Sequence, residues 1–261
     1  MRTNRVKQKL RRGQPTVGTM LTIGNSETTR LLANSGFDWL AVDHSRLDYR
    51  VAAENYMTVA ASGAIPLAYF PRANAHAIQQ ALSIGAFGII AHVHSLDEAH
   101  ELLAASKFPP KGNRDILSGG ANLNFECTVE EYFQSVNDQI LVVFVLESPS
   151  AIRSAGEICT LNGCDAIIIR PAALKIALRD EKDEYPTPQQ IEQIVSEMIS
   201  VTRDKGKPCG VHVTSLAQAQ QRIVQGLQFL AVSSDLGILG FSINALADGL
   251  GLTPKGDVNW Y

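Results

Sequence analysis

The chain has 261 residues, of which 45% are hydrophobic and 19% are charged, and this composition excludes a disordered protein. A formal net charge of −3 leaves no basic excess for a nucleic-acid backbone, so we expect no nucleic-acid partner. The length exceeds the usual domain size of about 100–150 residues, but α/β barrels reach about 250 residues as one domain.

The first twelve residues carry six lysines and arginines, as the start of a transit peptide can. They lack the apolar core of a secretory signal and lead directly into a turn and a strand, so we predict an exposed first helix. The four cysteines lie at least five positions apart, which indicates neither a CxxC metal site nor a disulfide framework. We therefore expect a cytoplasmic protein with no membrane partner.

Short apolar runs rich in β-branched residues alternate with segments of helical periodicity, which is the pattern of βαβ units around a parallel sheet. The predicted strands are Thr16–Leu21, Trp39–Asp43, Pro66–Tyr69, Gly88–His92, Ile140–Glu147, Ala166–Arg170, Pro208–Val213 and Phe229–Ser233. Glycines stand where the intervening helices should end, namely Gly36, Gly63, Gly85, Gly163, Gly206 and Gly226. We predict an α/β fold in which residues 1–261 form a single (β/α)8 TIM barrel with a short N-terminal helix and a C-terminal helix.

Three of the predicted helices begin at residues typical of N-caps, Ser26, Ser95 and Thr128. Between the fourth and fifth predicted strands, Pro109–Cys127 is rich in Gly and Asn and long for a barrel connection, so we expect it to shape the substrate pocket. Near the end of the chain, Leu239–Leu252 is apolar at helical spacing. We expect this segment to pack on its own barrel, with a neighbouring subunit as the alternative.

Active sites of α/β barrels lie at the carboxyl ends of the strands, and those ends are unusually polar here. They carry Asp43, His44, Arg46, Tyr69, Arg72, His92, His94, Glu147, Arg170, His212, Thr214, Ser233, Ser234 and Asp235. Strand ends meet solvent, so a single polar residue at one of them does not by itself indicate a function. Together they suit a small anionic substrate, with arginine as a carboxylate fork and histidine or tyrosine as proton carrier. Three converging acids or histidines would instead hold a divalent metal ion.

Several segments form a set in a fixed order along nearly the whole chain. They are Gly18-Thr19-Met20, Gly36-Phe37-Asp38-Trp39-Leu40 with Asp43, Gly85-Ala86-Phe87-Gly88-Ile89-Ile90, Phe108-Pro109-Pro110-Lys111-Gly112-Asn113-Arg114 and Leu146-Glu147-Ser148. This set resembles the HpcH/HpaI aldolase family. The resemblance implies a barrel of the phosphoenolpyruvate/pyruvate-binding type and a metal-dependent class II aldolase that cleaves 4-hydroxy-2-oxo acids into pyruvate and an aldehyde.

In that family a Glu and an Asp hold the divalent ion, a His after the second strand transfers protons, and an Arg after the third strand stabilises the oxyanion. Carried over by resemblance, the Glu is Glu147. The Asp position holds Ala173, the His position holds Arg46 with His44 two places earlier, and the Arg position holds Tyr69. These departures lie at positions that the resemblance assigns to catalysis, whereas the motifs named above, which belong to the scaffold, match the family.

We therefore predict a carbon–carbon lyase with an altered, metal-poor site, acting on a 2-oxo acid or related small carboxylate through an enolate-like intermediate. Aldol cleavage, decarboxylation and rearrangement all remain open. The predicted catalytic residues are Asp43, His44, Arg46 and Tyr69, the substrate-binding residues are Arg72, His92, Arg170, Ala172 and His212, and the metal-binding residue is Glu147. Arg170 would partly replace the metal, because arginine keeps its charge at working pH. No cofactor is certain, and a divalent ion (Mg²⁺, Mn²⁺ or Co²⁺) is the alternative.

The competing hypothesis is a catalytically silent homologue, in which Arg170 and Glu147 form a structural ion pair that fills the old metal site. Such a protein would bind a carboxylate ligand or a protein partner. Under both hypotheses the resemblance implies a homo-oligomer, either a hexamer or a trimer.

Overall fold

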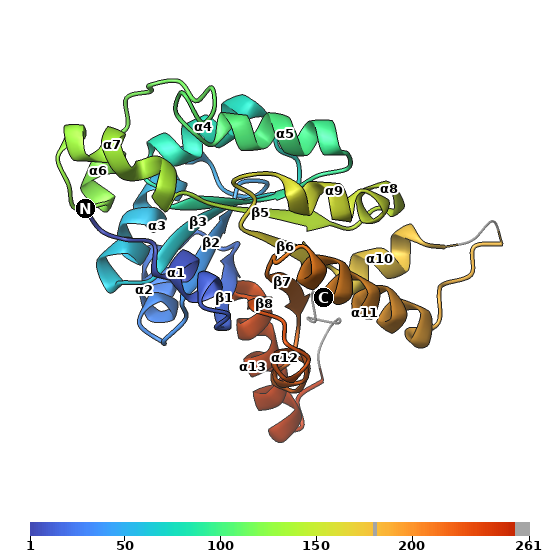
Figure 1. Ribbon diagram of the computed structural model, residues 1–261. Helices are drawn as coiled ribbons and strands as arrows, with labels where there is room; N and C mark the ends of the chain where they lie inside the picture. Colours follow the sequence, from blue (N-terminus) through green and yellow to red (C-terminus); the bar gives the residue numbers. More distant parts are fainter. Residues whose placement is uncertain (180–181, 254–261) are drawn as a thin grey trace.

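The structure, a computed structural model, describes residues 1–179 and 182–253, so residues 180–181 and 254–261 of the predicted domain lie outside the described part. Eight parallel strands form one closed barrel in chain order, and β8 pairs with β1 to close it (Figure 1). The strands are β1 (Thr16–Leu21), β2 (Trp39–Asp43), β3 (Ile65–Phe70), β4 (Gly88–His92), β5 (Leu141–Leu146), β6 (Ala166–Ile169), β7 (Cys209–Val213) and β8 (Phe229–Ser234). The predicted α/β barrel is confirmed.

Helices connect the strands on the outside of the barrel (Figure 1). They are α1 (Arg5–Arg11), α2 (Ser26–Ala33), α3 (Tyr49–Ser62), α4 (Ala75–Ser83), α5 (Leu96–Ala105), α6 (Ala121–Asn124), α7 (Val129–Gln139), α8 (Pro149–Arg153), α9 (Ala155–Thr160), α10 (Pro171–Ala177), α11 (Pro188–Asp204), α12 (Leu216–Val224) and α13 (Asp235–Gly249).

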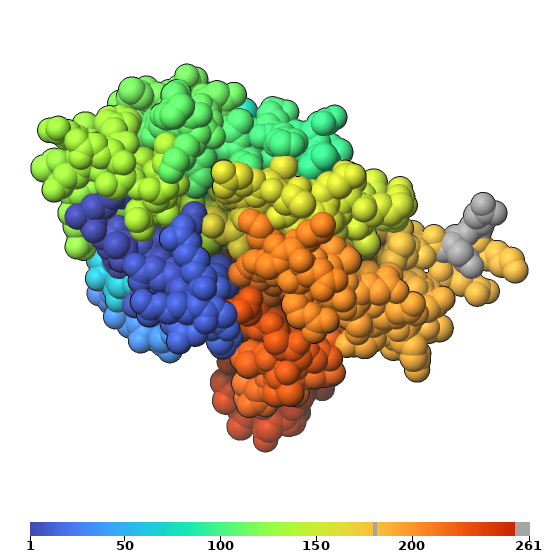
Figure 2. Space-filling view, in the orientation of Figure 1, coloured from blue at the N-terminus to red at the C-terminus, as the bar shows by residue number. Residues whose placement is uncertain are grey.

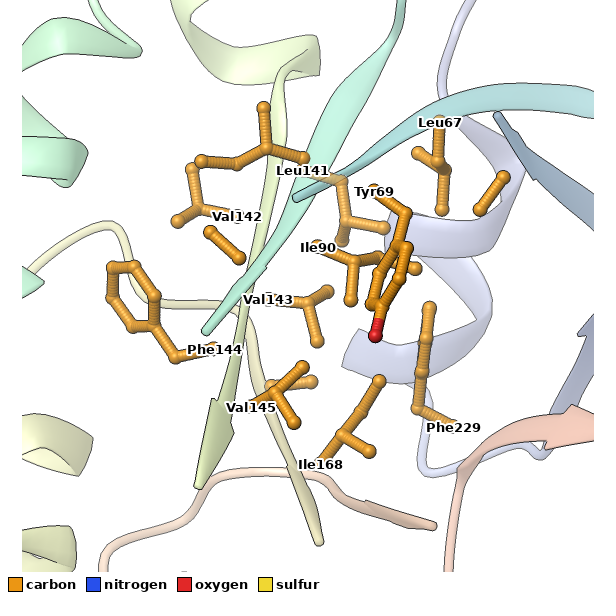
Figure 3. Close-up of a cluster of buried hydrophobic side chains, with 14 of the residues drawn as sticks. Leu67, Tyr69, Ile90, Leu141, Val142, Val143, Phe144, Val145, Ile168 and Phe229 are labelled. Atoms are coloured by element: carbon orange, nitrogen blue, oxygen red, sulfur yellow. The ribbon is translucent and has the colours of Figure 1, made fainter. Parts of the chain in front are cut away.

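The strands lie where the sequence predicts them, because both faces of a parallel barrel sheet are covered and its strands are nearly continuous apolar runs. β1, β2 and β4 have the predicted bounds, and the other five differ by one residue at one or both ends. Figure 3 shows the alternation along β5, where Val143 and Val145 point to one side and Val142 and Phe144 to the other. All four side chains are buried.

One close approach inside the barrel requires a glycine. Trp39 is fully buried and stacks on Phe229, with 4.5 Å between ring centroids. A Cβ atom on Gly18 would lie 2.3 Å from the Trp39 carbonyl oxygen, closer than any non-bonded carbon and oxygen can approach. A side chain at Gly18 would therefore force β1 and β2 apart.

Helix α1 is exposed on one face, which carries Arg5, Gln8 and Arg11, and buried on the other, so the prediction of an exposed helix is wrong for the second face. Val6, Lys7 and Leu10 are buried, and the Lys7 ammonium group donates to the Ile140 carbonyl oxygen at 2.8 Å and to the Asp165 carboxylate at 2.9 Å. Because these partners directly precede β5 and β6, α1 lies across the amino-terminal ends of the strands. The i, i+4 spacing of the two apolar residues was the signal for a buried face.

The helix ends follow the predicted chemistry with one difference. All six predicted glycines have positive φ, between 65° and 110°. Ser95 caps α5, and Thr128 caps α7 with a complete capping box. Helix α2 is capped by Asn25 instead of Ser26, and the Asn25 side chain accepts from the backbone N–H groups of the next turn. Asn and Ser are equally good N-caps, so adjacent candidates could not be separated from sequence.

The segment Pro109–Cys127 lies between α5 and β5 and contains the short helix α6. A connection from a helix to the next strand lies on the amino-terminal side of a (β/α)8 barrel, opposite the carboxyl ends. None of its residues, all of which the structure describes, lines the pocket at the carboxyl ends. The expectation that this segment shapes the substrate pocket of its own chain is wrong.

Helix α13 projects from the barrel wall, at the lower edge of the views in Figures 1 and 2. The apolar segment Leu239–Leu252 does not pack on its own barrel as expected, since Phe241, Leu246 and Leu250 are 73%, 67% and 72% exposed. Within residues 1–179 and 182–253, no helix is both long and apolar enough to cross a membrane.

Candidate active site at the carboxyl ends of the strands

A pocket of about 330 Å³, here called the mouth pocket, opens at the carboxyl ends of the strands. Its lining combines polar strand ends with apolar barrel side chains. The lining residues are Met20, Thr22, Asp43, Ser45, Arg46, Tyr69, Pro71, Ile90, Val145, Ile168, Arg170, His212, Thr214, Ala231, Ser233, Ser234 and Leu236. The pocket lies where α/β barrels place their active sites and has the size of a small-ligand site.

Four polar side chains from successive strands form a hydrogen-bonded ring at one wall of the mouth pocket. The Tyr69 hydroxyl lies 2.8 Å from His92 Nε2, and His92 Nδ1 lies 2.7 Å from Glu147 Oε1. Arg170 Nη1 lies 3.0 Å from Glu147 Oε2 and 3.4 Å from the Tyr69 hydroxyl. Tyr69 and Arg170 line the pocket, whereas His92 is 2% exposed and lies behind them.

The apolar surroundings of Tyr69 fix the direction of its hydroxyl. Figure 3 shows the ring among Leu67, Ile90 and Phe229, in the interior of the barrel. Only 8% of the residue is exposed, so its ring cannot turn into solvent. Its phenol oxygen is held between the imidazole of His92 and the guanidinium of Arg170.

Glu147 is ionised in this ring. Burial opposes ionisation, but the hydrogen bond with His92 and the charge of Arg170 outweigh it, and the pKa of Glu147 falls below its ordinary value. A carboxylate can only accept, so His92 Nδ1–H donates to Glu147, while His92 Nε2 faces the Tyr69 hydroxyl.

The residues present do not fit the two-ligand metal site that the resemblance implies. Both Glu147 oxygens are engaged, one by His92 and the other by a permanent cation, Arg170. The position of the second ligand is Ala173, which has no donor atom. Within the described residues no three His, Cys, Asp or Glu side chains gather in a way that would hold a metal ion. A divalent ion beside the Arg170 guanidinium would also be repelled by its charge.

Asp43 and Arg46 both line the mouth pocket after β2. The Asp43 carboxylate is largely buried and accepts from the backbone N–H and the hydroxyl of Ser45, at 2.8 Å and 2.6 Å. These bonds hold the turn that carries the exposed Arg46 side chain to the rim. The rim therefore carries a second cation of its own.

The structure places His44 outside the mouth pocket. Its Nε2 lies 2.6 Å from the buried Tyr56 hydroxyl, and its ring stacks on Phe70 and contacts Tyr49, with centroid distances of 4.7 Å and 5.0 Å. Burial lowers the pKa of His44 to about 4. The imidazole is thus a neutral packing group between β3 and α3.

The remaining predicted substrate-binding residues divide into two groups. His212 lines the mouth pocket, and burial together with the charge of Arg170 lowers its pKa to about 4, so it presents a neutral imidazole. Arg72 and Ala172 are exposed and do not line the pocket.

Thr22 is a pocket residue that sequence reasoning did not identify. It follows β1 directly and lines the mouth pocket, so the strand-end argument could have found it. Asp235, 3% exposed, accepts from the Thr22 backbone N–H at 2.9 Å, from its hydroxyl at 2.6 Å, and from the backbone N–H of Ile23 at 2.9 Å. This carboxylate ties the loop after β1 to the start of α13.

Ser233, also in the lining, has a left-handed φ of 55°.

Comparisons with known proteins give a consistent result. The sequence model of the family HpcH/HpaI aldolase/citrate lyase matches residues 21–240. The chain is 29% identical to a 5-keto-4-deoxy-D-glucarate aldolase of Salmonella gallinarum over 249 residues, which cover 94% of this chain and 96% of that protein.

Solved structures superpose over nearly the whole chain. An HpcH/HpaI aldolase/citrate lyase family protein from Burkholderia cenocepacia has a TM-score of 0.86 at 24% identity, covering 95% of this chain and 100% of that one. An HpcH/HpaI aldolase from Desulfitobacterium hafniense has a TM-score of 0.81 at 25% identity, covering 95% and 97%.

Proposed function

Because the chain belongs to the HpcH/HpaI aldolase/citrate lyase family, we propose that it is a carbon–carbon lyase acting on a small 2-oxo acid or related carboxylate in the mouth pocket. The observation that carries this proposal is the place of Arg170, 3.0 Å from Glu147 and 3.4 Å from the Tyr69 hydroxyl on the pocket wall. A fixed guanidinium beside a phenol hydroxyl suits a carboxylate next to a developing oxyanion.

In the proposed reaction the bond between C3 and C4 of the 2-oxo acid breaks, and its electron pair moves into the C2 carbonyl group to give an enolate. C4 leaves as carbon dioxide when it is a carboxylate carbon, or as an aldehyde when its hydroxyl group releases its proton to water. The Arg170 guanidinium binds the C1 carboxylate and stabilises the enolate oxygen. Glu147 fixes the guanidinium in place through its ion pair. The Tyr69 hydroxyl then delivers a proton to C3, and His92, 2.8 Å away, holds that hydroxyl in position. No step requires the second metal ligand that the chain lacks.

The first test is turnover of a panel of 2-oxo acids, including oxaloacetate and 4-hydroxy-2-oxo acids. We expect Arg170→Ala to lower kcat about 10²–10³-fold, the usual effect of removing one oxyanion donor. Arg170→Lys keeps the charge but loses the planar fork, so its rate should lie between the rates of the wild-type protein and Arg170→Ala. Arg72→Ala is the matched control, because this arginine is exposed and lies outside the mouth pocket.

A second test concerns metal dependence. After treatment with a chelator, we expect the wild-type protein to keep its rate and its affinity for oxamate. Complete loss of turnover that Mn²⁺ or Co²⁺ restores would overturn the metal-poor part of the proposal. No turnover of any acid in the panel would overturn the lyase activity itself.

A silent homologue that binds a carboxylate is the second candidate. It is favoured by the full engagement of Glu147 and by Ala173 at the second ligand position. This candidate predicts that oxamate or pyruvate raises the melting temperature of the wild-type protein. The increase should be smaller for the Arg170→Ala variant, and neither protein should turn over any acid of the panel.

A further inference from the structure

A second cavity, of about 220 Å³ and here called the lateral cavity, shares no lining residue with the mouth pocket. It lies between α7 and the segment before α6, on the amino-terminal side of the barrel. Its lining residues are Ser83, Phe108, Arg114, Ile116, Leu117, Ser118, Gly119, Gly120, Ala121, Asn122, Val129, Tyr132 and Phe133. The volume is below the range of about 300–1,000 Å³ typical of drug-sized ligands, so it fits a smaller molecule.

The lateral cavity contains a buried arginine whose hydrogen bonding is incomplete. Arg114 is 3% exposed, its Nη2 donates to the Tyr132 hydroxyl at 3.1 Å, and its guanidinium lies 4.4 Å from the centroid of the Phe108 ring. Its Nε and Nη1 have no hydrogen-bond partner among residues 1–179 and 182–253. No carboxylate of the described residues lies within 4.0 Å of it, in contrast to Arg170 in the mouth pocket.

A buried guanidinium with two unpaired nitrogen atoms and no counter-ion in the described part of the chain is costly, and an anion from outside the chain would remove that cost. Arg114 is the one charged side chain of this lining, so the charge balances with a single negative charge. The planar fork of arginine matches a carboxylate best.

The rest of the lateral cavity is suited to an apolar body. Ile116, Val129 and Phe133 line it and are 74%, 58% and 38% exposed, so apolar surface there is in contact with water. Covering that surface is favourable by about 25 cal/mol per Å². Cation and apolar wall together select an acid with one carboxylate and a hydrophobic remainder.

We propose that the lateral cavity is a second ligand site, which binds a small monocarboxylic acid with an aromatic or branched aliphatic body. Its carboxylate would pair with Arg114, and its body would cover the apolar wall. This site does not depend on the lyase activity, because the two cavities have separate linings and separate cations.

The experiment is a calorimetric titration of the Arg170→Ala variant with benzoate and with 3-methylbutanoate. The Arg170→Ala background removes the carboxylate fork of the mouth pocket, and the variants of the lateral-cavity lining then assign the remaining binding to one site. We expect one saturable site per chain, and at least tenfold weaker binding of benzamide, which has the same shape and no charge. Adding Arg114→Gln to this background should weaken benzoate binding at least tenfold.

A second variant keeps the test decisive if Arg114→Gln does not fold. Val129→Asp places a carboxylate in the lining at an exposed first-turn position of α7, where an acidic residue is compatible with the helix dipole. We expect it to weaken benzoate binding at least tenfold, while Val224→Asp, on the exposed surface of α12, leaves it unchanged.

Three results would overturn the proposal. One is no saturable binding of either acid at millimolar concentrations, and another is unchanged binding in both lining variants. The third is tighter binding of inorganic phosphate than of benzoate, which would assign the cavity to another anion class.

Discussion

Arg170 and Ala173, three positions apart, change the chemistry available to the barrel. A metal ion offers a Lewis acid, whereas a guanidinium offers directed hydrogen bonds and a permanent positive charge. Arg170 occupies one Glu147 oxygen, and Ala173 removes the other donor that the resemblance implies. In the proposed reaction, the chain thus uses an electropositive centre beside Tyr69 in place of the metal coordination that the resemblance implies.

The role of Tyr69 is the first prediction at this scale. Replacing it with phenylalanine keeps the ring between Leu67 and Ile90 but removes the hydroxyl that lies 2.8 Å from His92. We expect kcat to fall about 10²–10⁴-fold, the usual contribution of a general acid–base group, with little change in KM. Steady-state rates on the best acid of the panel measure this. Tyr49→Phe is the control, since Tyr49 lies outside the mouth pocket, and equal rates for Tyr69→Phe and wild type would remove Tyr69 from the mechanism.

His44 makes a prediction about stability. Its pKa is about 4 in the folded chain because of burial, and about 6.5 in the unfolded chain, so only the unfolded chain gains this proton between those values. The unfolding free energy should therefore fall as the pH drops from 6.5 to 4, by about 3 kcal/mol for this residue.

Urea unfolding of wild type and His44→Gln at pH 7 and pH 4.5 checks this prediction. The glutamine amide can keep the hydrogen bond to Tyr56 without titrating. We expect the variant to lose less stability on acidification than the wild type, while His76→Gln, at an exposed position of α4, behaves like the wild type. An equal loss in His44→Gln would contradict the assignment.

At the scale of elements, the start of α13 holds one edge of the mouth pocket. Asp235 binds the loop after β1 through both carboxylate oxygens, and Ser234 caps the helix by accepting from the Gly237 N–H. The loop carries Thr22, so the position of this pocket residue depends on the contact with Asp235.

Asp235→Ala should leave buried donors of the β1 loop unpaired, at a cost of about 3 kcal/mol in unfolding free energy. Because Thr22 would lose its anchor, we also expect weaker binding of oxamate. Chemical denaturation and a ligand titration measure the two effects. Asp248→Ala, at an exposed position of the same helix, should change neither, and a similar loss in both variants would refute the anchoring role.

At the scale of the whole molecule, the single chain leaves apolar side chains of α13 and of the residues after it in contact with water. Phe241, Leu246, Leu250 and Leu252 are each at least 60% exposed. The C-terminal segment to which they belong projects from the barrel in Figure 2. Contiguous apolar surface of this kind marks an interaction site. We propose that α13 packs against another copy of the chain in the expected homo-oligomer.

Light scattering tests this proposal. The wild-type protein should have the mass of an oligomer, and the double variant Phe241→Asp, Leu246→Asp should shift toward the mass of one chain. Ile176→Asp, at an isolated exposed position on α10, should keep the wild-type mass. A monomeric wild type, or an unchanged mass in the double variant, would contradict the proposal.

The barrel and the polar character of its mouth were predictable from the sequence by itself. A strand buried on both faces must be an apolar run, so local composition located every strand to within one residue. A residue at a strand end lies at the mouth once the strands are parallel, which brought Asp43, Arg46, Tyr69, Arg170 and His212 to the pocket lining.

Only the tertiary structure decided which of those side chains meet. His44 follows β2 directly, and its backbone N–H still donates to the Tyr69 carbonyl oxygen of β3 at 3.0 Å. The side-chain alternation of the strand therefore extends to His44, which faces α3 while Asp43 faces the pocket. The ring of Tyr69, His92, Glu147 and Arg170 joins four strands, and its distances depend on strand register, which local sequence does not encode. The buried face of α1 and the exposed face of α13 were decided in the same way, by contacts between residues far apart in the chain.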